Sequence, residues 1–390
     1  MTYVNGPPKM DFAHAGDPVL TITVATSVTA VSSIWHELEE YGVSTPYQSL
    51  DWYDSWMRIV APCEGEAPLI LVAFDRRGRA VLLLPLVLRR RFSANIASFA
   101  GNKHANFHMP LFRSDVTFTR PALDHIFTEA ARLRPDIDLF ALDAQPAFWN
   151  GMANPLVGTK ARPYTATATV LTLRSDPERL FFESLTADRR RRLRANDRKF
   201  HRFGIAYRRA VSAAEIHQAL SSFSAHKTPW FLTRGLTNPF TPNVIAFIAD
   251  LAIRSKVEIH CLATEHGSNL AVAATLTAGN RTSLLLISYD ATSLFAAYSP
   301  GIRLIRDIIA NGCNRGLSEF DFGLGEATYK TSFGAKSEPT YIDLRPQTYR
   351  GELAAALIKA EHKAKAVMKA HPRVLATVLR SRQKLCPLGG

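Results

Sequence analysis

In the second half of the chain, some segments have the apolar pattern of strands and others have the spacing of three and four that is typical of helices. Segments at 257–264, 270–278 and 282–289 predict three strands. A helix is expected from residue 300 to Gly316, because Ser and Pro at 299–300 suit a helix start and Gly suits its end. The apolar residues of this helix recur at spacings of three and four and share one face: Ile302, Ile305, Ile308 and Ile309. A short apolar strand follows at 319–324.

The rest of the chain also predicts a mixture of strands and helices. Apolar segments at 69–74 and 80–88 flank Asp-Arg-Arg-Gly at 75–78, which predicts a β-hairpin. Other expected strands lie at 20–25, 137–142 and 165–173. Expected helices lie at 28–41, 48–60, 121–133, 176–184, 187–202, 212–226, 242–254 and 352–369, with a loop at 227–235.

This order of elements predicts an α/β (α+β) fold of two mixed-sheet units flanked by helices. With 390 residues the chain is long enough for two full cores, and a Gly- and Pro-rich segment separates them. The expected organisation is a leader at 1–18, an N-terminal domain at 19–149, a linker at 150–163, a C-terminal domain at 164–350, and a basic helical tail at 351–390.

The stretch from Glu319 to Phe333 contains the most informative motif. The strand ends in Asp321, glycines stand at 323 and 325, and a Tyr-Lys pair stands at 329–330. Glycines at a strand end let a ligand approach the backbone closely, and a Lys just beyond can reach a phosphate or a developing oxyanion. A strand-turn-strand edge with a solvated Lys would show the same residues.

Together with Tyr-Ser-Pro-Gly at 298–301 and Tyr-Lys-Thr-Ser-Phe at 329–333, this motif resembles the GNAT acyltransferase superfamily. The similarity is greater to the tandem-GNAT branch that includes CelD-type cellulose-biosynthesis acyltransferases and Fem peptidyltransferases, and it covers roughly residues 35–346. It implies two GNAT-like units around a central cleft, with acyl-CoA as co-substrate. The usual GNAT pyrophosphate loop has an Arg or Gln and two spaced glycines, whereas Ser, Pro and Gly stand here at 299–301.

The resemblance implies a role for each residue of the motif. Lys330 would stabilise the oxyanion, Tyr329 would protonate the leaving group, and Asp321 would orient the acceptor or act as base. The pyrophosphate of acyl-CoA would bind the first turn of the helix, whose free N–H groups form an anion site: Tyr298, Ser299, Pro300, Gly301 and Ile302. The Tyr as a core residue and the Asp as a turn cap are the structural alternatives.

The expected reaction is N- or O-acylation of an amino-sugar, an amino-acid-like molecule or a polysaccharide-related acceptor, as in exopolysaccharide biosynthesis. Attack would be direct, because no Cys or Ser stands where a nucleophile is expected. A Fem-type aminoacyl or peptidyl transferase is the first alternative. A non-catalytic partner in exopolysaccharide assembly and a protein that binds nucleic acid or another anionic polymer are the others.

Substrate-binding candidates come from three further segments. Arg191, Arg194 and Arg198 share one face of the basic helix and can hold phosphates or an acidic glycan, although a solvated basic face shows the same spacing. Trp230, between Lys227 and Arg234, can stack on a substrate, and Gly323 belongs to the Gly-rich turn.

His104, Asn106 and His108 occupy alternate positions, which places them on one side of an extended chain. We expect an acceptor-binding loop, with structural hydrogen bonding as the alternative. A metal site would need a third ligand that the sequence does not supply, so no metal is expected.

Composition narrows the class of protein. The chain is 47% hydrophobic and 21% charged, as in ordinary globular proteins. Four scattered cysteines argue against a disulfide framework and a zinc site. The longest apolar run, 80–88, is too short to cross a bilayer, and the N-terminus lacks a signal-peptide pattern. We therefore expect a cytoplasmic protein.

The net charge of +13 comes from two blocks, 188–202 with a net of +6 and 355–390 with +7. Such blocks indicate anionic partners, but no nucleic-acid-binding motif accompanies them, so no specific nucleic acid is expected. The lysines of the second block recur at helical spacing beside a weak apolar face: Lys359, Lys363, Lys365 and Lys369. They predict at most a weak, salt-sensitive contact with anionic membranes.

Overall fold

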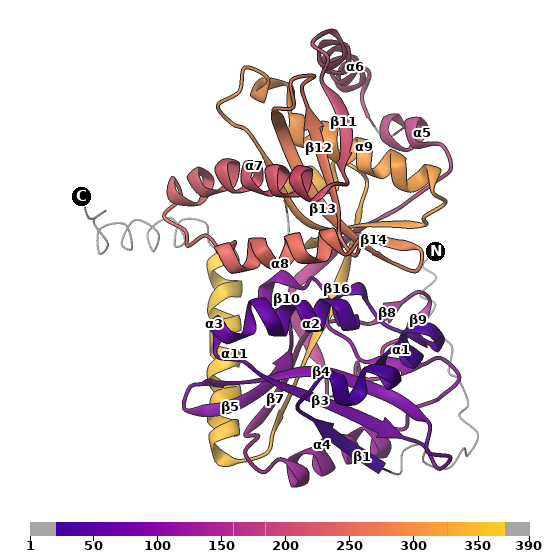
Figure 1. The fold of residues 1–390 in the computed structure, drawn as a ribbon, viewed down its shortest axis with the longest axis vertical. Coiled ribbons are helices and arrows are strands. Elements are labelled where there is room, and N and C mark those ends of the chain that lie inside the picture. Colours follow the sequence, from indigo (N-terminus) through magenta and orange to yellow (C-terminus); the bar gives the residue numbers. More distant parts are fainter. Residues whose placement is uncertain (1–20, 159, 184, 326, 371–390) are drawn as a thin grey trace, which may run out of the picture.

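The predicted mixed α/β fold is confirmed. The computed structural model describes residues 21–370 except 159, 184 and 326, so the leader at 1–18 and the last part of the tail lie outside it. Within the described residues, 14 strands form one mixed sheet with helices on both faces. Figure 1 shows the N-terminal half below in indigo and purple and the C-terminal half above in orange.

The N-terminal half arranges its strands in the order β1-β3-β4-β5-β7. The hairpin expected at 75–78 joins β3 and β4, and β5 runs parallel to β7. The strands are β1 (Thr21–Ala25), β2 (Gly42–Val43), β3 (Ala67–Phe74), β4 (Ala80–Arg91), β5 (Ala94–Phe99), β6 (Leu111–Arg113), β7 (Leu139–Pro146), β8 (Phe148–Trp149) and β9 (Met152–Ala153). The helices are α1 (Ser32–Tyr41), α2 (Leu50–Ile59), α3 (Ala61–Glu64) and α4 (Arg120–Leu133).

The C-terminal half arranges its strands in the order β15-β14-β13-β12-β11. The three strands expected before the helix are confirmed. The strands are β11 (Ala206–Ala210), β12 (Glu258–Ala263), β13 (Asn269–Ala278), β14 (Arg281–Tyr289) and β15 (Glu319–Leu324). The helices are α5 (Pro177–Phe182), α6 (Ala187–Arg202), α7 (Ala213–Leu232), α8 (Pro242–Ile253), α9 (Pro300–Asn314) and α10 (Thr328–Thr331).

Helices α7 and α9 pack on opposite faces of the C-terminal sheet. Alternate side chains of β13 point to opposite faces: Val272 and Ala274 belong to the core that contains α7, while Ala271 and Ala273 belong to the core that contains α9. A ligand that contacts both helices must therefore pass through an opening in the sheet.

Two strands join the halves into one sheet. β16 (Lys336–Pro346), which follows the Gly-rich motif in sequence, returns to the N-terminal half and pairs with β7 on one side. On its other side β16 pairs with β10 (Arg162–Thr172), which in turn pairs with β15. The motif is therefore flanked by strands of both halves.

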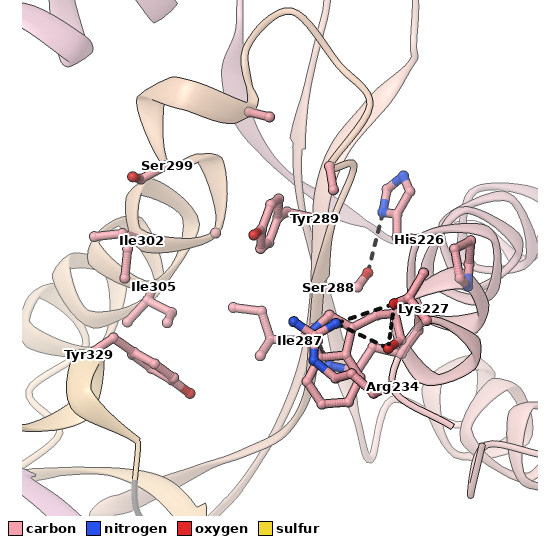
Figure 2. Close-up of a pocket in the computed structure, with 16 residues that line it drawn as sticks. His226, Lys227, Arg234, Ile287, Ser288, Tyr289, Ser299, Ile302, Ile305 and Tyr329 are labelled. Carbon is pink, nitrogen blue, oxygen red and sulfur yellow. Dashed lines mark hydrogen bonds between the residues drawn. The ribbon is translucent and has the colours of Figure 1, made fainter. Parts of the chain in front are cut away.

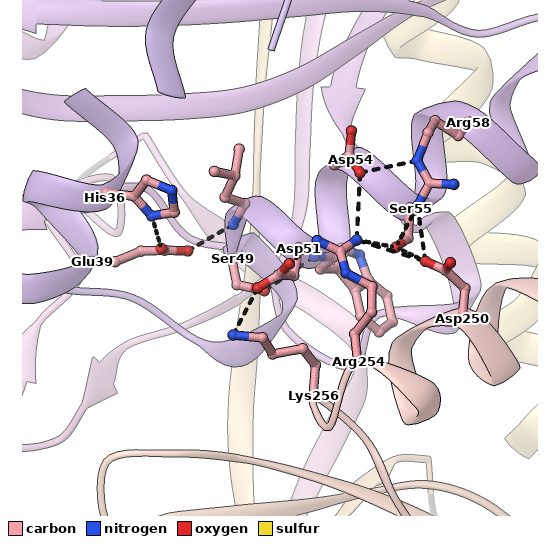
Figure 3. A network of polar contacts seen from close by, with 12 residues as sticks. His36, Glu39, Ser49, Asp51, Asp54, Ser55, Arg58, Asp250, Arg254 and Lys256 are labelled. Carbon is pink, nitrogen blue, oxygen red and sulfur yellow. Dashed lines mark hydrogen bonds and ion pairs between the residues drawn. The ribbon is translucent and has the colours of Figure 1, made fainter. Parts of the chain in front are cut away.

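A second contact between the halves is made by α2 and α8 (Figure 3). The ring of Phe247 lies edge-on to Trp52 and Trp56, with centroids 4.8 and 5.3 Å away. Around these rings, Arg58 pairs with Asp250 at 2.9 Å. A second group of ionic contacts joins α2 to the residues that follow α8: Arg254 with Asp51 and Asp54, and Lys256 with Asp51. The combination of buried rings and ion pairs fixes the halves against each other.

Two local predictions need correction. The segment at 227–235 is not a loop throughout, because α7 continues to Leu232 with Pro229 inside its last turns. Proline removes one helical hydrogen bond, and packing of Trp230, Phe231 and Phe240 rings on one another supports these turns instead. The basic helix α11 (Tyr349–Ala370) starts earlier than expected.

The first turns of α11 are also part of the core rather than a free tail. Ala354, Ala355 and Ile358 are buried against Ile96 and Leu139 of the N-terminal sheet. The membrane contact predicted for this helix can therefore involve only its remaining, exposed face.

Candidate functional site

The parallel strands β14 and β15 separate partway along their length. They pair only from Arg281 to Ser283 on β14, opposite Glu319 to Asp321 on β15. Beyond these residues each strand continues without the other, β14 to Tyr289 and β15 to Leu324. We call the space between the two diverging segments the C-terminal opening.

Three cavities meet in the C-terminal opening. One of about 350 Å³ lies between the strands and is lined by Leu284, Gly323 and Lys330, among others. A larger one of about 560 Å³ extends past β14 to the start of α9 (Figure 2). A third of about 310 Å³ lies between α6 and α9. Tyr329 lines all three, so it marks the point where they join.

The first turn of α9 faces two of these cavities. Ser299, Ile302 and the backbone of Gly301 line the largest, and Ser299 adopts the left-handed conformation (φ 59°, ψ 60°) without a side-chain capping hydrogen bond. The first N–H groups of a helix have no acceptor within it, so they can donate hydrogen bonds to a bound anion. Pro300 is the first helical residue, as expected, whereas Tyr298 packs with Phe200 and lines no described cavity.

Lys330 bridges the Gly-rich turn. Its side chain is only 5% exposed, and Nζ donates to the carbonyl oxygens of Gly323, Leu324 and Gly325 at 3.0, 3.2 and 2.8 Å. An ammonium has three N–H donors, so in this geometry all of them hold the turn. Burial lowers the pKa of Lys330, and Asp321 opposes that shift. Lys330 is thus a clamp on the loop that borders the opening.

Asp321 lies at the apex of the opening, where the strand pairing ends. It is fully buried, and Oδ1 accepts a hydrogen bond from the backbone N–H of Gly323 at 2.8 Å. Oδ2 has no partner among the described residues, and the nearest guanidinium nitrogen of Arg281 is 4.0 Å from Oδ1. Burial raises the pKa of Asp321, opposed by Arg281. Its carboxyl lines none of the three cavities, so here it supports the turn rather than facing a ligand.

Tyr329 faces the cavities with its ring and is partly buried. Burial raises the pKa of its hydroxyl to about 12, so the hydroxyl stays protonated at neutral pH. A protonated phenol can donate a hydrogen bond or a proton to a leaving group.

The structure separates His104, Asn106 and His108 instead of placing them on one side. His104 ends a 3-10 turn and packs against Trp56 and Phe240, and burial lowers its pKa to about 4. His108 stacks on Phe99 in the N-terminal half. The turn breaks the extended conformation on which that prediction relied.

Asn106 alone of the three reaches the C-terminal opening. Its Nδ2 donates to the hydroxyl of Tyr47 at 2.8 Å and to the carbonyl of Leu284 at 3.0 Å. It also lies against Gly323, where an added Cβ would come within 2.9 Å of the amide. Gly323 has φ 77°, so both its conformation and this contact require glycine.

The basic helix α6 turns a different face to the site from the one predicted. Arg191, Arg194 and Arg198 are exposed and line no described cavity. Arg194 instead contacts Glu178 at 3.3 Å and the ring of Phe182 at 5.0 Å. The cavity is lined by other residues of the helix, one or two positions away: Arg189, Arg192, Leu193 and Asn196. Leu193, the one apolar residue in this run of arginines, was the signal for the inward face.

Sequence reasoning about site residues did not single out His226 of α7. His226 lines the largest cavity beside Lys227 and Arg234 (Figure 2), which the sequence indicates, together with Trp230, as candidates for substrate binding. Figure 2 shows them across β14 from Ser299 and Ile302 of α9. Nδ1 of His226 lies 3.3 Å from the hydroxyl of Ser288, and burial lowers the pKa of His226, opposed by Asp290. At neutral pH this imidazole is therefore uncharged and able to take a proton.

Two features are absent from the described residues, 21–370 without 159, 184 and 326. No group of three or more His, Cys, Asp or Glu side chains is arranged to hold a metal ion. None of the helices in that range is long and apolar enough to cross a membrane.

Comparison with known proteins agrees with this geometry. Residues 187–331 match the family model described as an acetyltransferase (GNAT) domain. No curated protein gives a significant match to the chain. The match includes α6, α7, the diverging strands, α9 and the Tyr-Lys pair.

Solved structures share the whole fold at low sequence identity. FemX is 10% identical, with 84% of this chain and 98% of FemX covered and a TM-score of 0.55. A conserved protein of unknown function from Bacteroides thetaiotaomicron is 10% identical, with 83% and 99% covered and a TM-score of 0.52. The C-terminal domain of a putative lysylphosphatidylglycerol synthetase from Agrobacterium fabrum is 14% identical, with 86% and 96% covered and a TM-score of 0.51. These likenesses concern the fold alone, and the match to the GNAT acetyltransferase domain model is confined to residues 187–331.

Proposed function

We propose that the protein is an acyl-CoA-dependent acyltransferase whose donor binds in the C-terminal opening. The observation that carries the proposal is the divergence of β14 from β15 next to an uncapped α9 N-terminus. An extended ligand can add to a free strand edge through backbone hydrogen bonds, while its phosphates bind the helix N-terminus. A long donor with a phosphate end and an amide-containing arm suits both features.

The residues around the opening fit such a donor. Backbone N–H groups at Gly301 and Ile302 would hold the pyrophosphate, with Arg189 and Arg192 adding positive charge from α6. The arm would lie along β14 and end near Tyr329, where the cavities join. Bound acyl-CoA would supply the activated thioester, and the protein would supply position and charge.

The acceptor would attack the thioester directly. The described lining of the three cavities contains no cysteine, and burial raises the pKa of Cys261 to about 12, which keeps that thiol protonated. Neutral His226 would take the proton of an acceptor amine, and Tyr329 would donate a proton to the departing sulfur. Lys330 would act on the oxyanion only if it releases one of its carbonyl partners.

The acceptor class is also part of the proposal. We infer an amine or hydroxyl on an amino-sugar, an amino-acid-like molecule or a polysaccharide-related compound, in a cytoplasmic protein of exopolysaccharide biosynthesis. FemX and the synthetase domain share the fold. A test of the proposal must therefore distinguish an acyl-CoA donor from an aminoacyl donor.

Thermal-shift titration of the full chain separates these donors. We expect acetyl-CoA or a longer acyl-CoA to raise the melting temperature by several degrees, since a ligand at 100 times its Kd stabilises by ~2.7 kcal/mol. An aminoacyl-tRNA should give no comparable shift. If only aminoacyl-tRNA stabilises the protein, or if no acyl-CoA binds, the proposal is wrong.

A matched pair of variants tests the location. Gly301→Asp places a carboxylate at the anion site, where the added Cβ meets only Tyr289 at 3.5 Å. A carboxylate in a first helical turn stabilises the helix but repels phosphate, so acyl-CoA affinity should fall at least ~10-fold while the fold persists. Pro121→Asp makes the same change in the first turn of α4 and should leave the affinity unchanged.

A further inference from the structure

The described lining of the three cavities carries cations without carboxylates. Arg189, Arg192, Lys227 and Arg234 line them, whereas no described Asp or Glu does. Arg306, which also lines one of them, is paired with Asp197 at 3.1 Å. Lys227 and Arg234 stand apart from the others, because they lie on α7 and the loop after it rather than beside the proposed phosphate site on α9.

Lys227 has an environment that favours an added anion. It is half-buried, and Nζ makes one hydrogen bond, to the carbonyl oxygen of Ile287 at 3.2 Å. The same ammonium lies 4.8 Å from the ring centre of Trp230. Burial lowers the pKa of Lys227, and the nearby Arg234 lowers it further, with no acidic group acting against them. Two of its three N–H donors therefore remain for a ligand, among the described contacts.

Arg234 contacts the same indole. Its guanidinium lies 4.3 Å from the ring centre of Trp230, and Nη1 donates to the carbonyl of Trp230 at 3.2 Å. These contacts leave Nε and Nη2 without a described partner. The 40% exposed Trp230 thus holds two cations at the mouth of a cavity. Two like charges held together without a counter-charge repel each other, and an anionic ligand would remove that repulsion.

We propose that Lys227, Trp230 and Arg234 form the acceptor subsite and that the acceptor carries an anionic group, a carboxylate or a phosphate, beside the nucleophile. This inference rests on the proposed acyl-CoA function, because it assigns the α9 wall to the donor and the α7 wall to the acceptor. Figure 2 shows the two walls on opposite sides of β14. The pair of cations would hold the anion, Trp230 would contact the apolar body of the acceptor, and His226 would lie next to the attacking group.

Acceptor pairs that differ in charge test the subsite in the full chain. With acetyl-CoA as donor, release of the CoA thiol is measured for glycine against glycinamide and for glucosamine 6-phosphate against glucosamine. We expect the anionic member of at least one pair to have a ~10–100-fold higher kcat/KM, the range for a charged hydrogen bond. The pair that responds distinguishes a carboxylate from a phosphate.

Variants of the two cations then test whether they cause the preference for anionic acceptors. Lys227→Met and Arg234→Gln should each remove at least ~10-fold of that preference through the acceptor KM, while the KM for acetyl-CoA stays within ~2-fold. Arg77→Gln, in the exposed β3–β4 hairpin, is the matched control and should change neither. The assignment is overturned if the enzyme prefers the neutral acceptors or uses both members of each pair equally. It is also overturned if Lys227→Met loses as much affinity for acetyl-CoA as for the acceptor.

A second readout separates this inference from the proposed function. Binding of the same acceptors is followed by NMR titration without any donor. We expect wild-type protein to bind the anionic member of the responding pair and Lys227→Met to lose that binding. If acetyl-CoA is not a donor but this binding persists, the donor assignment fails and the anionic subsite stands. If no anionic acceptor binds in this way, the subsite is wrong even with an active enzyme.

Discussion

In the N-terminal half, β5 and β7 run parallel and pair only at Ile96 and Ala97, opposite Leu139 and Phe140. In the C-terminal half, β14 and β15 run parallel and pair only near Ser283 and its partner residues before they separate. Each parallel pair is connected by a helix, α4 in the first half and α9 in the second. The two halves thus repeat one arrangement of strands that the sequence does not show as a repeat.

We call the corresponding space, where β5 and β7 separate, the N-terminal opening, and the chain itself fills it. The backbone N–H of His108 donates to the carbonyl of Ala144 on β7 at 3.1 Å, and its ring nitrogen Nδ1 lies 3.0 Å from a carboxylate oxygen of Asp143. The cavity that remains there is only about 60 Å³. The C-terminal opening instead borders cavities of about 350 and 560 Å³.

The two helix starts differ in the same way. Thr119 caps α4 by accepting a hydrogen bond from the N–H of Ala122 at 3.3 Å, whereas Ser299 makes no such bond at α9. A helix start that its own side chain caps has less need of a ligand. One arrangement of strands can thus be closed into core in one half and left open in the other.

The largest expected effect concerns the clamps that hold the loops beyond β15 and β7. Lys330→Met removes the donor of three hydrogen bonds to the Gly-rich turn, and we expect turnover to fall at least ~100-fold, because a shift of about 1 Å in the groups that border a site can cost that much. Asn154→Ala removes the amide that donates to the carbonyl of Pro146, the last residue of β7, at 3.0 Å. It should cost stability, ~1–3 kcal/mol, without changing turnover of the folded protein.

Turnover with acetyl-CoA and thermal unfolding are measured for both variants. Near-normal turnover in Lys330→Met would show that its clamp is not needed for activity. A large loss of turnover in folded Asn154→Ala would show that the N-terminal half takes part in the reaction. The contrast between a filled N-terminal opening and a functional C-terminal opening would then be wrong.

An intermediate effect is expected on the basic helix beside the C-terminal opening. Arg192 lines the cavity and Arg191 does not, although both are exposed. Arg192→Glu should weaken acyl-CoA binding ~10-fold, the loss of about one charged hydrogen bond, and Arg191→Glu less than ~2-fold. Calorimetric titration at two salt concentrations measures both, because a surface charge effect decreases with salt. Equal effects would mean that the whole helix acts as a diffuse basic field.

The smallest effect separates the two helix starts. Thr119→Ala removes a cap and should lower the free energy of unfolding by ~1 kcal/mol. Ser299→Ala removes no capping bond and should change it by less than ~0.5 kcal/mol. Hydrogen exchange in the first turns of α4 and α9 gives the local difference. If Ser299→Ala costs as much as Thr119→Ala, α9 is capped after all and the contrast between the halves is lost.

The fold was largely predictable because its elements depend on local patterns. Period-two and period-3.6 apolar spacing specified β12, β13, β14 and α9, and the turn residues at 75–78 specified the first hairpin. The resemblance of the Gly-rich motif to GNAT enzymes then supplied the arrangement of these elements, and the domain match at 187–331 agrees with it.

The composition of the site was less predictable, since it depends on contacts between distant residues. The sequence singled out Ser299, Gly301, Tyr329 and Trp230, which the structure brings to one set of cavities. It could not show which face of α6 turns inward, or that His104 belongs to a 3-10 turn that ends before Asn106. Rotation of a helix by one residue moves a side chain by 100°, so spacing alone does not fix the face.

By itself, then, the sequence determined the order of strands and helices, the Gly-rich turn and the residues with chemistry near it, because these follow from local periodicity and turn propensity. Three features follow from the tertiary structure and not from local sequence. β16 crosses back to join the halves, and Lys330 donates to three carbonyls of the Gly-rich turn. The N-terminal opening is filled, while the C-terminal opening borders cavities. Those outcomes depend on which segments far apart in the chain reach the same space, and packing rather than local preference settles that competition.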